Sequence, residues 1–248
     1  DGMGAHRMWS PFMKLPPIIH HEDGFNSDEA ERLNPKRNMF RRLMLPTAKA
    51  VAVPSQRLEG IARDVWKVPA HKLNRIPNGI DVAAYAKLPA PHAIAGFEKR
   101  EGEVVIGTLA GLRSVKNLPR LVRAFAQVPD HCRLVIVGEG PERGVIMAEA
   151  ERLGVADRIH MPGFIAKPQN YVGLFDIFAL SSDSEQFPIS LVEAMAAGLP
   201  AVSTDVGDVR HIVAPENHPF IVPLDDEAAY TGALTMLAID ADLRYNVG

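Results

Sequence analysis

Short β-branched apolar runs alternate repeatedly with segments of helical periodicity along this chain, and the alternation restricts the folds that it can adopt. After residue 100, six runs are predicted to be strands: Val104–Leu109, Arg133–Val137, Ile159–Met161, Ile177–Leu180, Ala201–Ser203 and Phe220–Val222. Between the first two runs, apolar residues recur at helical spacing and form a single stripe, at Leu118, Leu121, Val122 and Phe125. This alternation is typical of a parallel sheet covered by crossover helices. We therefore expect residues 97–248 to form a doubly wound α/β domain.

The first part of the chain shows the same alternation in a shorter form. Pro17–Ile19, Ala50–Val53 and Asn74–Pro77 are predicted to be strands, with a helix from about Pro35 to Leu45. The proline-containing stretch that ends near Arg100 is predicted to connect two domains, residues 1–96 and 97–248. Three strands are too few for a complete Rossmann-like domain, so we expect the first domain to be incomplete and the chain to be truncated at both ends.

Composition excludes several functional classes. The chain has 27 Lys and Arg against 30 Asp and Glu, so general nucleic-acid binding is not expected. No apolar run approaches the roughly 20 residues that a membrane-spanning helix needs, and the first residues lack the pattern of a signal peptide. The single cysteine, Cys132, allows no internal disulfide, which favours a reducing cytoplasmic location.

Two carboxylates, Glu185 and Glu193, are separated by seven residues across a predicted loop-to-helix junction. Ser190 is predicted to cap a helix that runs to about Ala197 and stops at Gly198. Glu193 would then lie in the first turn and Glu185 in the preceding loop. The same spacing also predicts a capping box, in which the Glu193 side chain returns to the backbone N–H of Ser190 and has no further role.

The string Ser-Asp-Ser-Glu-Gln-Phe-Pro, followed by Glu-Ala-Met-Ala-Ala-Gly-Leu-Pro, resembles the Glu-x7-Glu motif of retaining glycosyltransferases of family 4, which have the GT-B fold. The resemblance implies two Rossmann-like domains and transfer of a sugar from a nucleotide-activated donor with retention of anomeric configuration. It also implies that Glu193 binds the ribose hydroxyls. The donor sugar would be held by Glu185 together with backbone N–H groups of Gln186, Phe187 and Ile189, because Pro188 has none.

A glycine-containing loop follows the first strand of the second domain. It carries Arg113 and Lys116, and Asn117 can cap the next helix. Backbone N–H groups, an Arg fork and a Lys charge suit a diphosphate, although two solvated surface cations would give the same spacing. The loop resembles the family's Gly-x-Arg element with a following Lys. The resemblance implies that Arg113 and Lys116, with Gly111 beside them, hold the donor pyrophosphate.

Two further glycine elements follow the next strands. Gly138-Glu139-Gly140 lacks the third glycine of a dinucleotide fingerprint, since position 143 is Arg143. It resembles the family's Gly-x-Gly-Pro element near the nucleobase, and the loop at Phe164 resembles the one that flanks the base. A simple turn remains the alternative at both places.

The run His20, His21, Glu22, Asp23 follows the first predicted strand. Neighbours on an extended backbone point to opposite sides, so these residues would chelate one metal ion poorly. The family has a histidine at the end of such a strand, facing the cleft between its domains. His20 is the first candidate for this position and His21 the second, with an ordinary loop histidine as the alternative for each.

The predicted helix from Pro35 interleaves four basic with four apolar residues: Lys36, Arg37, Arg41, Arg42 and Met39, Phe40, Leu43, Met44. A basic amphipathic helix can lie on an anionic membrane, and an ordinary surface helix is the alternative.

Together these patterns predict a glycosyltransferase that uses a UDP- or GDP-sugar, with a glycan or lipid-linked acceptor. No metal is expected, because two fixed cations would neutralise the diphosphate. We expect the protein to be cytoplasmic, with peripheral membrane contact open, and the chain by itself to be inactive. A GT-B sugar-nucleotide epimerase and a non-catalytic nucleotide-binding fragment are the two alternatives.

Overall fold

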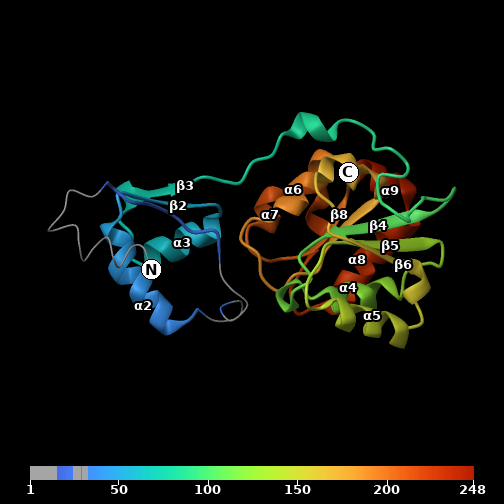
Figure 1. Ribbon diagram of the computed structural model, residues 1–248, viewed down its shortest axis with the longest axis horizontal. Coiled ribbons are helices and arrows are strands. Elements are labelled where there is room, and N and C mark those ends of the chain that lie inside the picture. Colours follow the sequence, from blue (N-terminus) through green and yellow to red (C-terminus); the bar gives the residue numbers. More distant parts are fainter. Residues whose placement is uncertain (1–15, 25–28, 30–32) are drawn as a thin grey trace. The chain divides into compact units, whose positions relative to one another are not determined.

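The structure, a computed structural model, describes residues 16–24, 29 and 33–248 (Figure 1). Contacts divide the chain into two compact units. The first extends to Asn78 and includes Glu185–Phe187, and the second comprises Gly79–Ser184 and Pro188–Gly248. This division precedes the boundary expected after residue 96, because Tyr85 and Ile94 are buried in the core of the second unit. Residues 1–15 of the expected first domain lie outside the described residues.

The second unit contains a six-stranded parallel sheet in the order β6-β5-β4-β7-β8-β9. Its strands are β4 (Val104–Leu109), β5 (Cys132–Val137), β6 (Ile159–Gly163), β7 (Ile177–Leu180), β8 (Ala201–Thr204) and β9 (Ile221–Val222). The strands expected from the apolar runs are confirmed to within two residues at each end. Strand order reverses between β4 and β7, which is where a doubly wound sheet opens a binding crevice at its carboxyl edge.

Helices cover both faces of this sheet, as Figure 1 shows. They are α4 (Leu118–Phe125), α5 (Arg143–Arg152), α6 (Ile189–Ala196), α7 (Val209–Ile212), α8 (Glu227–Ile239) and α9 (Ala241–Val247). Along β4, Val104 and Ile106 pack into the core beneath α4, α5 and α8, whereas Val105 packs into the opposite core with α6. A strand that is apolar on both sides is what a two-faced parallel sheet requires. The predicted apolar stripe of α4 is confirmed, since all four of its residues are buried.

The first unit contains a three-stranded parallel sheet, β1 (Ile19–His21), β2 (Ala50–Val53) and β3 (Leu73–Arg75), with helices α2 (Pro35–Met44) and α3 (Gln56–Asp64). Its core includes Val51, Val53, Leu58 and Trp66. The first strand differs from the prediction, because His20 and His21 lie within β1 and not in a loop after it. Their backbones pair with Val51 and Ala52, and backbone pairing does not depend on side-chain polarity.

Short 3-10 helices complete the described secondary structure: Leu45–Thr47, Ala70–Lys72, η4 (Val82–Tyr85), η5 (Ser114–Lys116), Ala156–Arg158, η7 (Pro168–Asn170), η8 (Val172–Leu174) and Pro215–Phe220. Among the described residues, no helix combines the length and apolar character needed to cross a bilayer.

Candidate functional site

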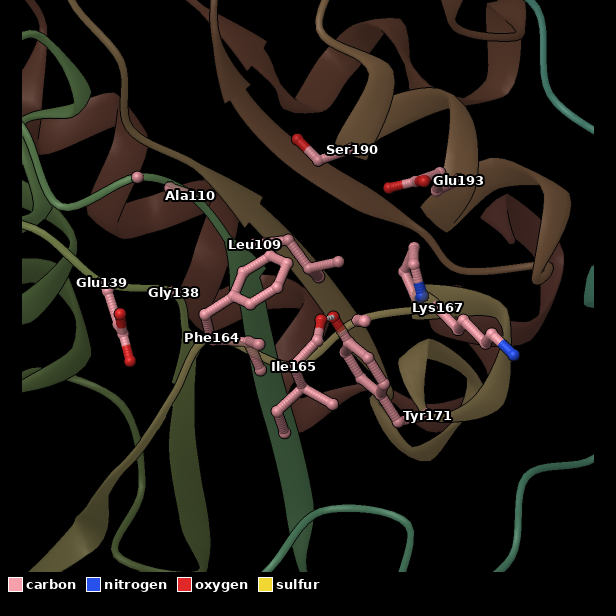
Figure 2. Close-up of a pocket in the computed structure, with 14 residues that line it drawn as sticks. Leu109, Ala110, Gly138, Glu139, Phe164, Ile165, Lys167, Tyr171, Ser190 and Glu193 are labelled. Atoms are coloured by element: carbon pink, nitrogen blue, oxygen red, sulfur yellow. Dashed lines mark hydrogen bonds between the residues drawn. The ribbon is translucent and has the colours of Figure 1, made fainter.

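A pocket of about 510 Å³ lies at the carboxyl edge of the second unit's sheet. Its walls come from the ends of β4 and β5, the loop after β6 and one side of α6. Figure 2 shows Ser190 and Glu193 on α6 at one side, and Phe164, Ile165 and Tyr171 at the other. The pocket therefore lies where a doubly wound sheet binds its ligand, outside the carboxyl ends of strands near the reversal of strand order.

Gly138 allows two of the pocket loops to approach each other closely. Its φ is +147°, and a Cβ there would overlap the carbonyl oxygen of Ala110 in the loop after β4. The backbone N–H of Gly138 donates to Gly163 at 2.9 Å, and that of Ala110 donates to Val137 at 3.0 Å. Gly138 thus allows the loops after β4, β5 and β6 to pack closely together, and their backbones form the floor of the pocket.

Arg113 and Lys116 lie on the turn that follows Gly111. Gly111 lines the pocket, whereas Arg113 directly precedes η5 and Lys116 is its last residue, and neither is a lining residue. The Arg113 side chain is exposed and makes no ion pair with any described residue, and Lys116 is half-buried. Asn117 adopts a left-handed conformation, with φ at 42°, and its side chain accepts a hydrogen bond from the backbone of Arg120, so its predicted capping role is confirmed.

A polar network that the sequence did not reveal links the loops after β4 and β7. Asn117 donates from Nδ2 to both carboxylate oxygens of Asp183, at 2.9 and 3.2 Å, and Arg120 Nη1 lies 2.9 Å from Asp183 Oδ1. Ser181 Oγ donates to the carbonyl of Lys116 at 2.9 Å. These bonds fix the turn that carries Lys116 to the neighbouring strand end at the reversal point. The residues lie more than 60 positions apart, so sequence spacing gave no signal of them.

The predicted capping box between Ser190 and Glu193 is wrong. Pro188 occupies the N-cap position, without a side-chain cap, and α6 begins at Ile189. Because Pro188 has its φ fixed near the helical value, at −68°, the helix starts before Ser190 can act as its cap. Glu193 lies beyond the first turn, and its Oε1 accepts a hydrogen bond from the Tyr85 hydroxyl at 2.9 Å. The predicted stop at Gly198, whose φ is +71°, is confirmed.

Burial sets the electrostatics around Glu193. Burial raises the pKa of its carboxyl group, and the hydrogen bond from Tyr85 opposes part of that rise. Burial, with a smaller effect of the Glu193 charge, raises the pKa of Tyr171 to about 12. Tyr171 is therefore a neutral phenol near pH 7, and its hydroxyl donates to the carbonyl of Ile165 at 3.2 Å. The pocket thus presents a half-buried carboxylate opposite an exposed aromatic ring, Phe164, which is 70% exposed.

The segment after β7 is divided between the two units. Glu185, Gln186 and Phe187 belong to the first unit, whereas Ile189 begins α6 in the second and is exposed. Gln186 is buried and its Oε1 accepts a hydrogen bond from Ser55 Oγ at 3.3 Å. Their expected roles toward a donor sugar stay predictions.

The two candidate histidines point in different directions, as neighbours on a strand do. His20 is half-buried, with its Nε2 atom 3.3 Å from Glu22 Oε2, and His21 is exposed, with its Nε2 atom 3.1 Å from Asp23 Oδ1. Within the described ranges, no three His, Cys, Asp or Glu side chains gather as metal ligands. The expectation that no metal is required stays a prediction, as do the roles of both histidines.

Two of the basic residues of helix α2 pair with a buried carboxylate. Glu29 has a fully buried side chain, and Arg37 and Arg41 donate to it at 3.0 and 2.9 Å. Burial raises the pKa of the Glu29 carboxyl, but the hydrogen bonds from Arg41 and Arg37 outweigh it and hold the pKa below its usual range. Met39 and Leu43, on the same helix, are exposed. Nothing in the sequence indicated that Glu29 would be the buried partner.

Comparison with known proteins identifies the family of this chain. The family model of glycosyl transferases group 1 matches residues 91–248. The chain belongs to this family. Its α/β architecture of parallel sheets is that of GT-B glycosyltransferases, so the predicted fold is confirmed. The predicted glycosyltransferase resemblance is confirmed at the level of this family.

Three similar proteins indicate how far the likeness extends. The N-acetyl-alpha-D-glucosaminyl L-malate synthase of Bacillus anthracis is 25% identical over 87% of this chain and 57% of its own length. The phosphatidyl-myo-inositol mannosyltransferase of Mycolicibacterium smegmatis is 31% identical over 68% of this chain and 44% of its own. Alr3699/HepE of Anabaena, solved in complex with UDP and glucose, is 21% identical with a TM-score of 0.79, over 99% of this chain and 67% of that one. The chain thus spans about half the length of these two sequence relatives.

Proposed function

We propose that this chain is the donor-binding part of a retaining glycosyltransferase of family 4 type. It would bind a nucleotide-activated sugar and serve its transfer to an acceptor hydroxyl. The observation that carries the proposal is the pocket at the reversal of strand order, where the Glu193 carboxylate and Phe164 line one cavity (Figure 2) together with Gly111. Membership of the glycosyl transferases group 1 family supports it.

Each part of the site suits one part of a nucleoside diphosphate sugar. The Glu193 carboxylate would accept hydrogen bonds from the ribose hydroxyls, and Phe164 with the backbone at Gly138 would flank the base. Arg113 and Lys116 would bind the diphosphate, with Gly111 allowing close backbone approach. The donor sugar would be held by Glu185 and the backbone N–H groups of Gln186, Phe187 and Ile189. A UDP- or GDP-sugar is proposed, and the UDP bound to Alr3699/HepE is consistent with the first.

The chemical step would replace one bond at the anomeric carbon with another on the same face. The acceptor oxygen bonds to that carbon, the bond to the phosphate oxygen breaks, and the proton of the acceptor hydroxyl passes to an oxygen of the departing nucleoside diphosphate. Negative charge grows on the departing diphosphate, so Arg113 and Lys116 would stabilise the transition state without a metal ion. Positive charge grows at the sugar carbon, which Glu185 would stabilise. His20 or His21 would contact the sugar or the acceptor.

The acceptor is proposed to be a glycan or a lipid-linked molecule reached at the cytoplasmic face of a membrane. Exposed Met39 and Leu43 beside exposed Lys36 and Arg42 make α2 the surface that would rest on anionic lipid.

The relatives named above are a synthase and a mannosyltransferase, which favours transfer over the epimerase alternative.

A thermal-shift and calorimetry series on the chain tests this function. UDP, GDP and ADP are compared with the matching nucleosides and sugar nucleotides. A ligand at about 100 times its Kd stabilises the folded state by about 2.7 kcal/mol, which is a readily measured rise in Tm. We expect at least one nucleoside diphosphate to produce that rise and its nucleoside to produce less. Failure of all three diphosphates to bind would overturn the proposal.

A further inference from the structure

Tyr85 lies directly behind the pocket carboxylate. It is the last residue of η4, it is 9% exposed, and its hydroxyl donates to Glu193 Oε1 at 2.9 Å. Glu193 lines the pocket, whereas Tyr85 is not among the lining residues. The two residues belong to the same unit but lie 108 positions apart in the sequence.

This hydrogen bond divides the two oxygens of the carboxylate between two tasks. Oε1 is engaged by Tyr85, and the second oxygen is left for other donors. A glutamate side chain has several rotatable bonds, so holding one oxygen restricts the directions in which the other can point. A phenol O–H donating to a carboxylate is charge-assisted and therefore stronger than a bond between two neutral groups.

We infer that Tyr85 is a positioning residue for the nucleotide site, which orients Glu193 so that its second oxygen meets the ribose hydroxyls. The inference rests on the proposed function, because it takes the ligand of Glu193 to be a ribose. Tyr85 itself would not touch the nucleotide. It lies in the chain segment that follows the boundary at Asn78, and this segment would contribute to the donor site through the Tyr85–Glu193 hydrogen bond.

The electrostatics of the pocket give this role a pH signature. Burial raises the pKa of Glu193 and the Tyr85 hydroxyl lowers it, so loss of the hydroxyl raises that pKa further. The other ionisable groups that line the pocket are Glu139, Lys167 and Tyr171. A carboxylate with a higher pKa takes up its proton at a higher pH. Nucleotide affinity should therefore begin to fall at a higher pH when Tyr85 is replaced by Phe than it does in the parent.

The test compares Tyr85→Phe with a matched control, Tyr230→Phe. Tyr230 is fully buried in the other core of the same unit, and its hydroxyl has no hydrogen-bond partner among the described residues, so its removal breaks no bond. UDP binding is measured by calorimetry from pH 8 to pH 5. We expect Tyr85→Phe to weaken UDP about three- to tenfold at pH 8, the worth of a typical hydrogen bond, and by a larger factor at pH 5. Tyr230→Phe should match the parent throughout.

A double-mutant cycle separates positioning from general destabilisation. In a Glu193→Ala background, which leaves Tyr85 no acceptor at this position, Tyr85→Phe should cause no further loss of UDP affinity, because Tyr85 acts through that carboxylate. Equal losses in both backgrounds, or parent-like UDP binding by Tyr85→Phe across the pH range, would overturn the inference.

A ligand-free measurement keeps this inference separable from the proposed function. The Glu193 carboxyl carbon is titrated by NMR in the parent and in Tyr85→Phe, and the variant should show the higher midpoint. An unchanged midpoint would overturn the inference even if UDP binds. Absence of any nucleoside diphosphate binding by the parent would overturn the proposed function, and with it the assignment of ribose as the ligand of Glu193.

Discussion

In the first unit, Arg37 and Arg41 are held against the buried carboxylate of Glu29, whereas in the second unit Arg113 extends from a turn into solvent. The first arrangement satisfies its charges internally and leaves little for a ligand. The second presents a cation beside a cavity whose floor is backbone. A basic residue therefore indicates a binding site only when the fold leaves its charge uncompensated next to a concave surface.

The backbone floor should be the most sensitive part of the second unit. Gly138→Ala would force a Cβ against the Ala110 carbonyl at a φ of +147°, so we expect a loss of about 2–5 kcal/mol in unfolding free energy, together with loss of UDP binding. Gly144→Ala is the control, since Gly144 lies within α5 and a Cβ there meets nothing within 4 Å. It should be neutral or stabilising by up to about 1 kcal/mol in urea unfolding. Equal behaviour of the two variants would contradict the role of the close approach.

Loss of the ion pairs around Glu29 should lower the stability of the first unit and leave nucleotide affinity unchanged. Glu29→Gln leaves Arg37 and Arg41 facing a neutral group, so we expect a loss of about 2–3 kcal/mol, less than for a fully buried pair because both arginines are partly exposed. Both tryptophans precede residue 79, so tryptophan fluorescence during urea unfolding reports on this part of the chain. Calorimetric UDP affinity of the folded variant should be unchanged, and a weakened affinity would break the contrast between the two units.

The Glu29 carboxylate should also make the stability of the first unit fall as the pH is lowered. The folded pKa of Glu29 lies below its ordinary value of 4.5, so its stabilising effect is complete above about pH 4.5 and is lost as the pH falls through the folded pKa. Urea midpoints measured between pH 6 and pH 3 should fall more steeply in the parent than in Glu29→Gln. Parallel curves would show that Glu29 is not the group responsible.

Arg113→Ala tests whether the uncompensated cation serves a diphosphate. We expect UDP affinity to fall by roughly 1.5–3 kcal/mol, the usual worth of a hydrogen bond to a charged group, with uridine affinity nearly unchanged. Lys116→Ala should behave in the same way, since both residues lie in the turn that follows Gly111. Calorimetry that shows equal losses for UDP and uridine would argue for a role in folding instead.

Replacing the two glutamates of the Glu-x7-Glu string should affect different properties. We expect Glu193→Gln to weaken nucleotide affinity and Glu185→Gln to slow sugar transfer. Because no capping box forms, Glu193→Gln leaves the start of α6 unaffected, and its expected loss of about 1–2 kcal/mol in affinity for every nucleotide reflects the carboxylate itself. Glu185→Gln should spare nucleotide affinity and reduce the rate of the proposed sugar transfer, since its contact strengthens as charge develops at the sugar carbon. Normal nucleotide binding by Glu193→Gln, or transfer at the parent rate by Glu185→Gln, would refute the assignment concerned.

Features that depend on residues close together in the sequence could be predicted from it. Features that depend on residues far apart in the sequence could not. Strands such as β4 and β7 were predictable because strand formation follows local apolar runs, and Gly198 because a helix stop is local. The start of α6 was predicted wrongly, since Ser190 is a strong cap signal and Pro188 competes with it only two residues away. The hydrogen bond from Tyr85 to Glu193 and the one from Asn117 to Asp183 join residues that only folding brings together. Spacing alone cannot indicate such pairs.

Two basic residues of α2 remain exposed and do not pair with Glu29. Lys36 and Arg42 would each add about 1 kcal/mol to binding of vesicles that contain anionic lipid, with Met39 and Leu43 supplying apolar contact. Lys36→Glu with Arg42→Glu should therefore abolish most co-sedimentation with such vesicles at low salt and leave unfolding unchanged. Lys87→Glu, an exposed lysine of the second unit, should have no effect and serves as the control. If both changes reduce sedimentation equally, the attraction comes from net charge and α2 is an ordinary surface helix.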